Sequence, residues 1–187
     1  MKIERGNSYR IKIDSLQVAQ GPHLSISRAL LDTGNSCISI PSRFKSMVLN
    51  EFNNAGAGYN KCEYDNEPFN RMFSLLRCRV RDFDRLPVIS IFIDGTQFAI
   101  DKDSYVQRCI WEGSDSLCDM YIESADYSSE LLIGDGFFNR YYTYFDIEDR
   151  EVGFAKNKET LSYKHMYKPH SALDKEDIEF FGKLQIE

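Results

Sequence analysis

The sequence predicts an all-β protein with short helices, and three observations carry this prediction. Apolar Tyr9, Ile11 and Ile13 alternate with polar residues, as in a strand that buries one face. Residues 88–93 and 96–100 are strand-like runs on either side of an Asp-Gly pair, a pattern typical of a β-hairpin. The 11 Tyr and 13 Phe also suit strands, in which aromatic side chains are enriched.

Further elements follow from the same patterns. Residues 26–31 and 37–40 are short apolar runs bounded by turns, and both are predicted strands. Ser42 is placed to cap the helix that follows, which the asparagines and glycines of 53–58 should end. The apolar face of this helix would consist of Phe44, Met47, Val48 and Phe52. Residues 59–86 are poorly periodic and are predicted to form short strands and loops.

Length and composition narrow the class of protein. A chain of 187 residues with 42% apolar residues can bury a core as one domain. The net charge of −6 leaves no basic stripe, so we expect no nucleic-acid partner. The sequence has no apolar run long enough to span a bilayer, so we expect no membrane partner. Residues 1–6 contain no apolar signal region.

The stretch 29–36, Ala-Leu-Leu-Asp-Thr-Gly-Asn-Ser, carries the most informative chemistry. Asp32 follows a buried strand, where a carboxylate is costly unless it is hydrogen-bonded or used. Gly34 allows another backbone or a substrate to approach closely. Thr33 and Ser36 offer hydroxyls and Asn35 an amide, all of which can orient the carboxylate. Alone, however, Asp-Thr-Gly also fits an ordinary turn at the end of a strand.

Three later segments favour the chemical interpretation. They are Leu-Leu-Ile-Gly-Asp at 131–135, Tyr-Tyr-Thr-Tyr-Phe-Asp at 141–146 and Val-Gly-Phe-Ala at 152–155. Together with Asp-Thr-Gly at 32–34, they resemble the C-terminal lobe of the pepsin-like (A1-type) aspartic proteases, over roughly residues 7–157. The resemblance implies a Greek-key-like lobe, half of a β-barrel protease, in which these strands cross in a ψ-shaped loop.

The resemblance also implies a function, aspartic endopeptidase, in which a water is activated between two aspartates. Asp32 would be the catalytic aspartate that this chain supplies, and it would be supported by Thr33, Gly34, Asn35, Ser36 and Gly134. The substrate-binding residues would be Leu30, Gly34, Asn35 and Leu132. The family usually has Thr or Ser where this chain has Asn35, and Asp135 matches a helix-start aspartate, not the second catalytic one. No metal or cofactor is expected.

The expected partners are a peptide or protein substrate and the missing N-terminal lobe, either in the same full-length chain or replaced by a second copy of this one. Two alternatives remain open. The chain could be a non-catalytic peptide-binding module, or a single-lobe protease that pairs two copies of Asp32 in a homodimer. The resemblance implies a secreted or vacuolar/lysosomal protein. Because the given sequence has no signal peptide, we expect Met1 not to be the start of the full protein.

The C-terminal part divides into ordered elements and a tail. Asp135 is predicted to cap a short helix that runs to about Tyr141, followed by strands at 142–145 and 152–155. Residues 1–157 would form the lobe. Residues 158–187 would form a polar tail that is partly disordered or a short helix, because the apolar pattern thins there.

The five cysteines predict disulfides with one thiol left over, because none forms a Cys-x-x-Cys pair and the three histidines complete no zinc pattern. Connectivity does not follow from spacing. The resemblance implies a Cys78–Cys118 bridge, and we expect Cys62–Cys109 as the second pair, with Cys37 free. Cys37 has no histidine near it in sequence, so a buried or bridged cysteine is favoured over a nucleophile.

Overall fold

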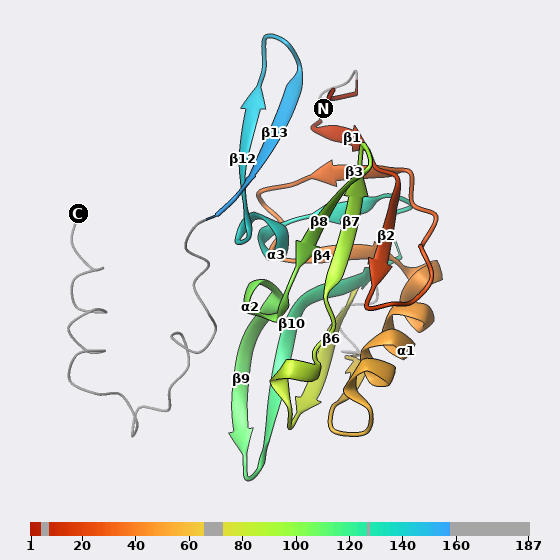
Figure 1. Cartoon of the computed structure of the whole chain (residues 1–187), viewed down its shortest axis with the longest axis vertical. Helices are drawn as coiled ribbons and strands as arrows, with labels where there is room; N and C mark the ends of the chain where they lie inside the picture. Colours follow the sequence, from red (N-terminus) through yellow and green to blue (C-terminus); the bar gives the residue numbers. More distant parts are fainter. Residues whose placement is uncertain (5–7, 66–72, 127, 158–187) are drawn as a thin grey trace, which may run out of the picture.

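The computed structural model describes residues 1–4, 8–65, 73–126 and 128–157, and shows the predicted all-β architecture with short helices (Figure 1). The expected tail, 158–187, lies outside the described residues. The strands are β1 (Arg10–Lys12), β2 (Ser15–Val18), β3 (Arg28–Leu31), β4 (Ile38–Pro41), β5 (Lys61–Tyr64), β6 (Phe73–Val80), β7 (Ile89–Ile93), β8 (Thr96–Ile100), β9 (Val106–Glu112), β10 (Asp115–Ala125), β11 (Leu131–Ile133), β12 (Tyr141–Asp146) and β13 (Glu151–Lys156). The helices are η1 (Ser42–Phe44), α1 (Lys45–Gly56), η2 (Phe83–Arg85), α2 (Lys102–Tyr105) and α3 (Asp135–Phe138).

The main sheet has eight strands in the order β1-β3-β11-β4-β10-β6-β5, with β9 also paired to β10. Most neighbours are antiparallel, but β11 runs parallel to β3 and β10 runs parallel to β4. Strand β11 therefore lies between β3 and β4, although about a hundred residues separate it from them in sequence. This arrangement is the ψ-shaped loop that the resemblance implies.

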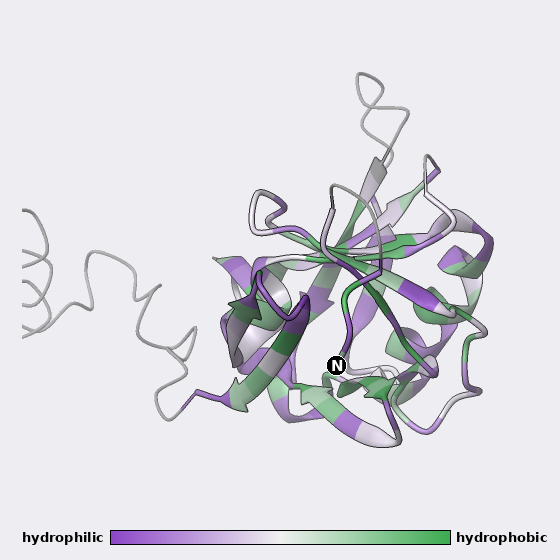
Figure 2. Ribbon diagram, turned by 90° about the horizontal axis from the view of Figure 1, so that it is seen from above, coloured by the Kyte–Doolittle hydropathy of each residue, from purple (hydrophilic) through white to green (hydrophobic). Residues whose placement is uncertain are grey.

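The predicted hairpin at 88–100 is confirmed. Strands β7 and β8 pair antiparallel, and β2 adds a third strand to their sheet. Asp94 and Gly95 have φ of 49° and 72°, so both central turn residues are left-handed, as the tightest hairpin turns require. Strands β12 and β13 form a separate two-stranded sheet. In Figure 2, hydrophobic and hydrophilic segments alternate along the strands, in keeping with sheets that bury one face.

Three details of the predicted helices are wrong. Ser42 does not cap α1, because η1 intervenes and α1 begins at Lys45 without a side-chain cap. Val48 and Phe52 are buried as predicted, but Met47 is 38% exposed, since the core covers a narrower stripe than the apolar residues span. Helix α3 ends at Phe138, before the predicted limit, because β12 already begins at Tyr141.

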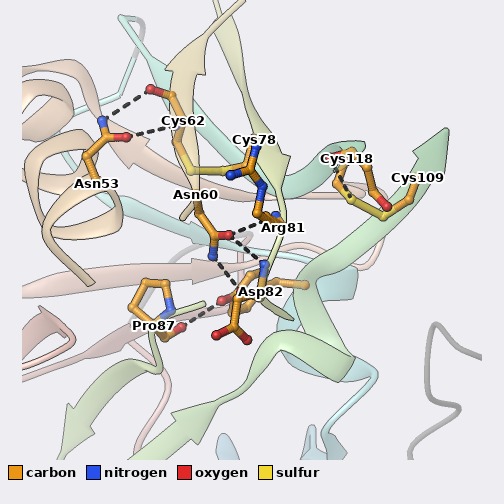
Figure 3. The surroundings of a disulfide bond; sticks show 11 residues. Asn53, Asn60, Cys62, Cys78, Arg81, Asp82, Pro87, Cys109 and Cys118 are labelled. Atoms are coloured by element: carbon orange, nitrogen blue, oxygen red, sulfur yellow. Dashed lines mark hydrogen bonds between the residues drawn. A yellow bond between two sulfur atoms is a disulfide. The ribbon is translucent and has the colours of Figure 1, made fainter. Parts of the chain in front are cut away.

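The disulfides are Cys62–Cys78 and Cys109–Cys118 (Figure 3). Cys37 is free and buried. The predicted Cys78–Cys118 and Cys62–Cys109 bridges are therefore wrong, while the free Cys37 is confirmed. Cys62, Cys78, Cys118 and Cys109 lie directly opposite one another on β5, β6, β10 and β9. We call these four residues the cysteine row.

The cysteine row explains both errors. Cys78 has Cys62 on one side and Cys118 on the other, so the sequence could not decide between two adjacent partners. Cys62 and Cys109 stand at the two ends of the row, three strand spacings or about 14 Å apart. A disulfide cannot span that distance, because its two Cα atoms must lie within about 7 Å.

Candidate functional site

Asp32 lies directly after β3, where the ψ-shaped loop fixes its backbone. The amide N–H of Asp32 donates to the carbonyl oxygen of Ile133, at the end of β11, over 2.9 Å. Leu30 and Leu132 are register partners on the same two strands. The residue is thus held by a segment that is distant in sequence, and its position does not depend on the local turn alone.

The carboxylate of Asp32 is only partly buried and is oriented by the turn that follows it. The amide N–H of Gly34 donates to Oδ1 over 2.9 Å, and the amide N–H of Asn35 donates to the backbone oxygen of Asp32 over 3.1 Å. Thr33, Gly34 and Ser36 are exposed. The turn therefore presents the carboxylate of Asp32 at the surface in a fixed orientation. Within the described parts of the chain, no second carboxylate hydrogen-bonds to it.

Gly134 is required by a close approach of two backbone segments. A Cβ at this position would lie 2.0 Å from the carbonyl oxygen of Asn35 and 2.5 Å from that of Cys37. The next amide N–H, that of Asp135, donates to the Asn35 oxygen over 3.0 Å. Because Gly134 has no side chain, the start of α3 can lie against the Asp32 turn, and its expected role in supporting catalysis stays a prediction.

The side chain of Asn35 does not orient the carboxylate, contrary to what its position suggested. Its Nδ2 donates to the carbonyl oxygen of Cys37 over 2.9 Å and to Oγ of Ser39 over 2.8 Å. Its Oδ1 accepts from the amide N–H of Cys37 over 3.2 Å. The amide therefore braces the turn against β4 instead of contacting Asp32. No hydrogen bond of the Thr33 or Ser36 hydroxyls is seen within the described part of the chain.

Two residues near the site were missed by sequence reasoning. Ser39, fully buried on β4, donates its hydroxyl to the carboxylate of Glu123, which is 7% exposed on β10. The available signal was a charged residue in the otherwise strand-like run 120–125. The contact itself joins residues 84 positions apart, so no local pattern could predict it.

Cys37 is not an activated nucleophile. Burial raises the pKa of its thiol to about 12, and the negative charges of Glu123 and Asp135 act in the same direction. The thiol is protonated at any ordinary pH, whereas a nucleophilic cysteine needs its thiolate. Within the described residues, no group of His, Cys, Asp or Glu side chains is placed to hold a metal ion.

Of the four residues expected to bind substrate, Leu30, Gly34 and Asn35 are at least partly exposed, while Leu132 is 9% exposed. They lie together around the end of β3 and β11, next to Asp32. A β lobe that presents one oriented aspartate from a ψ-shaped loop is the architecture of an acid-protease half.

Comparison with known proteins identifies the family. The model of the family described as eukaryotic aspartyl protease matches residues 1–157, and the chain belongs to this family. It is 27% identical over 133 residues to gastricsin of Macaca fuscata fuscata, a match that covers 68% of this chain and 30% of the relative. It is 29% identical over 154 residues to pepsin A of Sus scrofa, covering 79% and 35% of the two chains. It is 27% identical over 133 residues to plasmepsin IV of Plasmodium falciparum, a match that covers 71% of this chain and 26% of the relative.

The chain thus matches about a third of the length of these curated relatives. Among the described helices, none has the length and hydropathy needed to cross a membrane.

Proposed function

We propose that residues 1–157 are the C-terminal lobe of a two-lobe aspartic endopeptidase, and that Asp32 is one of its two catalytic aspartates. The observation that carries the proposal is the Asp32 turn itself. Its carboxylate is oriented by the Gly34 N–H, accessible from solvent, and backed by the glycine-dependent contact of Gly134. The one-third match to two-lobe relatives supports a missing N-terminal lobe in the same full-length chain.

The reaction needs two carboxylates on one water. One, ionised, takes the proton of the water as it attacks the peptide carbonyl, and the other, protonated, donates to the carbonyl oxygen. This chain supplies one of them, so the partner lobe must supply the second. Thr33 and Ser36, whose hydroxyls are exposed beside Asp32, would meet that partner.

The substrate would be an extended peptide that lies across the cleft between the lobes. Leu30 and Leu132 would contact its side chains, and Gly34 and Asn35 would border its backbone. Tyr142 and Tyr144 lie on one face of β12 and are 64% and 58% exposed, so a partner lobe that covered this face would remove their rings from water. A second copy of the chain is the alternative partner.

The two disulfides support an oxidising compartment for this protein, so we infer that it is secreted or resides in a vacuole or lysosome.

The test is Asp32→Asn in the full-length protein, assayed on denatured protein at acid pH. We expect loss of at least about 99% of pepstatin-sensitive cleavage, because the amide can neither accept nor share the proton. Circular dichroism should show an unchanged fold. Asp94→Asn is the matched control, since Asp94 is exposed in a left-handed turn where Asn is equally suited. An Asp32→Asn variant that cleaves at near the wild-type rate would refute the proposal.

A further inference from the structure

A carboxylate is buried behind the Asp32 turn, and the proposed reaction does not use it. Glu123 lies on β10, directly opposite Ser39 of the parallel strand β4, and is 7% exposed. Its Oε1 accepts the hydroxyl proton of Ser39, which is itself fully buried. A carboxylate in such a place is costly, and it is tolerated only when hydrogen bonds compensate for its lost water.

The hydrogen bonds continue from Ser39 to the site. Oγ of Ser39 accepts from Nδ2 of Asn35 over 2.8 Å, and the second N–H of the same amide goes to the carbonyl of Cys37. With Oδ1 also bonded to the Cys37 N–H, every polar group of the Asn35 side chain is engaged. We call Glu123, Ser39 and Asn35 the Asn35 brace.

The direction of the brace is fixed by chemistry. An amide nitrogen can only donate, so the Ser39 oxygen must accept from Asn35 and its own proton must go elsewhere. The Ser39 hydroxyl donates this hydrogen to Oε1 of Glu123. Each member therefore sets the orientation of the next, from the buried carboxylate outward to Asn35.

The main-chain groups of Asn35 connect the Asn35 brace to the Asp32 turn. The amide N–H of Asn35 donates to the backbone oxygen of Asp32 over 3.1 Å, and its carbonyl accepts from the Asp135 N–H over 3.0 Å. Among the described residues, Asp32 and Asp135 hydrogen-bond to the main chain of Asn35, Cys37 bonds to its side chain, and Glu123 follows beyond Ser39. A change in the rotamer of Asn35 would therefore release the turn from β4.

We propose that Glu123 and Ser39 are positioning residues, which act through Asn35 to hold the turn that orients Asp32. Neither touches the reacting atoms. The kinetic part of the inference rests on the proposed function, whereas the structural part can be measured on this chain alone.

The structural test uses Cys37 as a reporter, because it is the free thiol and both its backbone polar groups are bonded to Asn35. In the 187-residue chain, Ser39→Ala should raise the rate of Cys37 alkylation at constant pH about tenfold, since it removes both hydrogen bonds of Ser39 without changing charge. The fold-increase in the rate of Cys37 alkylation should exceed the fold-change in the equilibrium constant for global unfolding, which is measured in urea. Ser39→Thr, which keeps the hydroxyl, should restore the wild-type rate.

Ser116→Ala is the matched control. Ser116 is as deeply buried on β10, and its hydroxyl has no hydrogen-bond partner among the residues that the structure describes, so its loss should leave Cys37 alkylation unchanged. Should Ser39→Ala fail to fold, Asn35→Ala tests the same brace from its exposed end and should accelerate alkylation equally. Alkylation of the Ser39 or Asn35 variant at the control rate would overturn the proposal.

The kinetic test uses the full-length protein. Ser39→Ala should lower kcat about tenfold and leave KM within about twofold, because the aspartate is misplaced while peptide contacts persist. Ser39→Thr should recover kcat. A folded Ser39→Thr variant that loses as much kcat as Ser39→Ala would overturn the positioning role. If the wild-type protein cleaves no peptide, the proposed function has failed, and Cys37 alkylation still decides whether the brace holds the turn.

Discussion

The two disulfides should contribute unequally to stability, and the structure gives the size of the difference. Cys62–Cys78 joins residues 16 positions apart, and Cys109–Cys118 joins residues nine positions apart. In the chain-entropy model, these loops correspond to about 3.1 and about 2.6 kcal/mol at 25 °C. Loop length alone thus favours the first bridge by only about 0.5 kcal/mol.

Burial enlarges this difference. Cys62 and Cys78 are 3% and 0% exposed, whereas Cys109 is only half-buried beside the buried Cys118. Truncating both cysteines of the first bridge to alanine leaves two buried sites short of a sulfur atom, each with a cavity cost. We therefore expect the Cys62→Ala/Cys78→Ala variant to lose about 1–2 kcal/mol more than the Cys109→Ala/Cys118→Ala variant.

Urea denaturation of the 187-residue chain measures both values, and Cys37→Ala controls for the loss of a buried cysteine without a bridge. Equal free energies of unfolding for the two double variants, or the reverse order, would show that neither loop length nor burial sets the contribution.

Three further predictions follow. The 187-residue chain alone should not cleave peptides as a monomer, because one aspartate cannot be both base and acid. The chain should also self-associate, and light scattering from a stable monomer at low micromolar concentration would contradict the need for a partner. Gly134→Ala should cost at least about 3 kcal/mol in urea denaturation, since its Cβ would lie 2.0 Å from the Asn35 oxygen, whereas Gly153→Ala, with nothing within 4 Å, should cost far less. Stability should fall on the alkaline side, because the pKa of Cys37 is raised from 9.0 to about 12. The unfolded chain loses that proton near pH 9 while the folded chain keeps it, so Cys37 should contribute a loss of about 1.4 kcal/mol between pH 8 and 10, and Cys37→Ala should remove this contribution.

Local patterns predicted the elements that local forces determine. The hairpin at Asp94-Gly95 follows from the conformation these two residues adopt easily, and the structure has it at the predicted bounds within one residue. The cap expected of Ser42 failed because an extra helical turn, η1, fits between β4 and α1. A side chain that can cap a helix does not determine where the helix begins.

The site was predictable only in part, for a related reason. Asp32, its turn and Gly134 stand in recognisable motifs, and a known family supplied their arrangement. Glu123 and Ser39 have no motif, because their hydrogen bond depends on the parallel pairing of β4 with β10. Asn35 was expected to orient the carboxylate of Asp32. Its side-chain amide instead donates to the Cys37 carbonyl and the Ser39 hydroxyl, and these acceptors are visible only in the folded chain.

The cysteine row has a consequence for oxidative folding. A disulfide between Cys78 and Cys118 would join two strands that are already neighbours in their native register. Such a wrongly oxidised chain would keep its sheet and carry thiols at the two ends of the row, Cys62 and Cys109. Thiol–disulfide exchange could then pass from one cysteine to the next without separating any strands. The attack of Cys62 on Cys78 releases the thiol of Cys118 beside that of Cys109, and an oxidant then closes the second native bridge, so the sheet itself acts as the template for the repair.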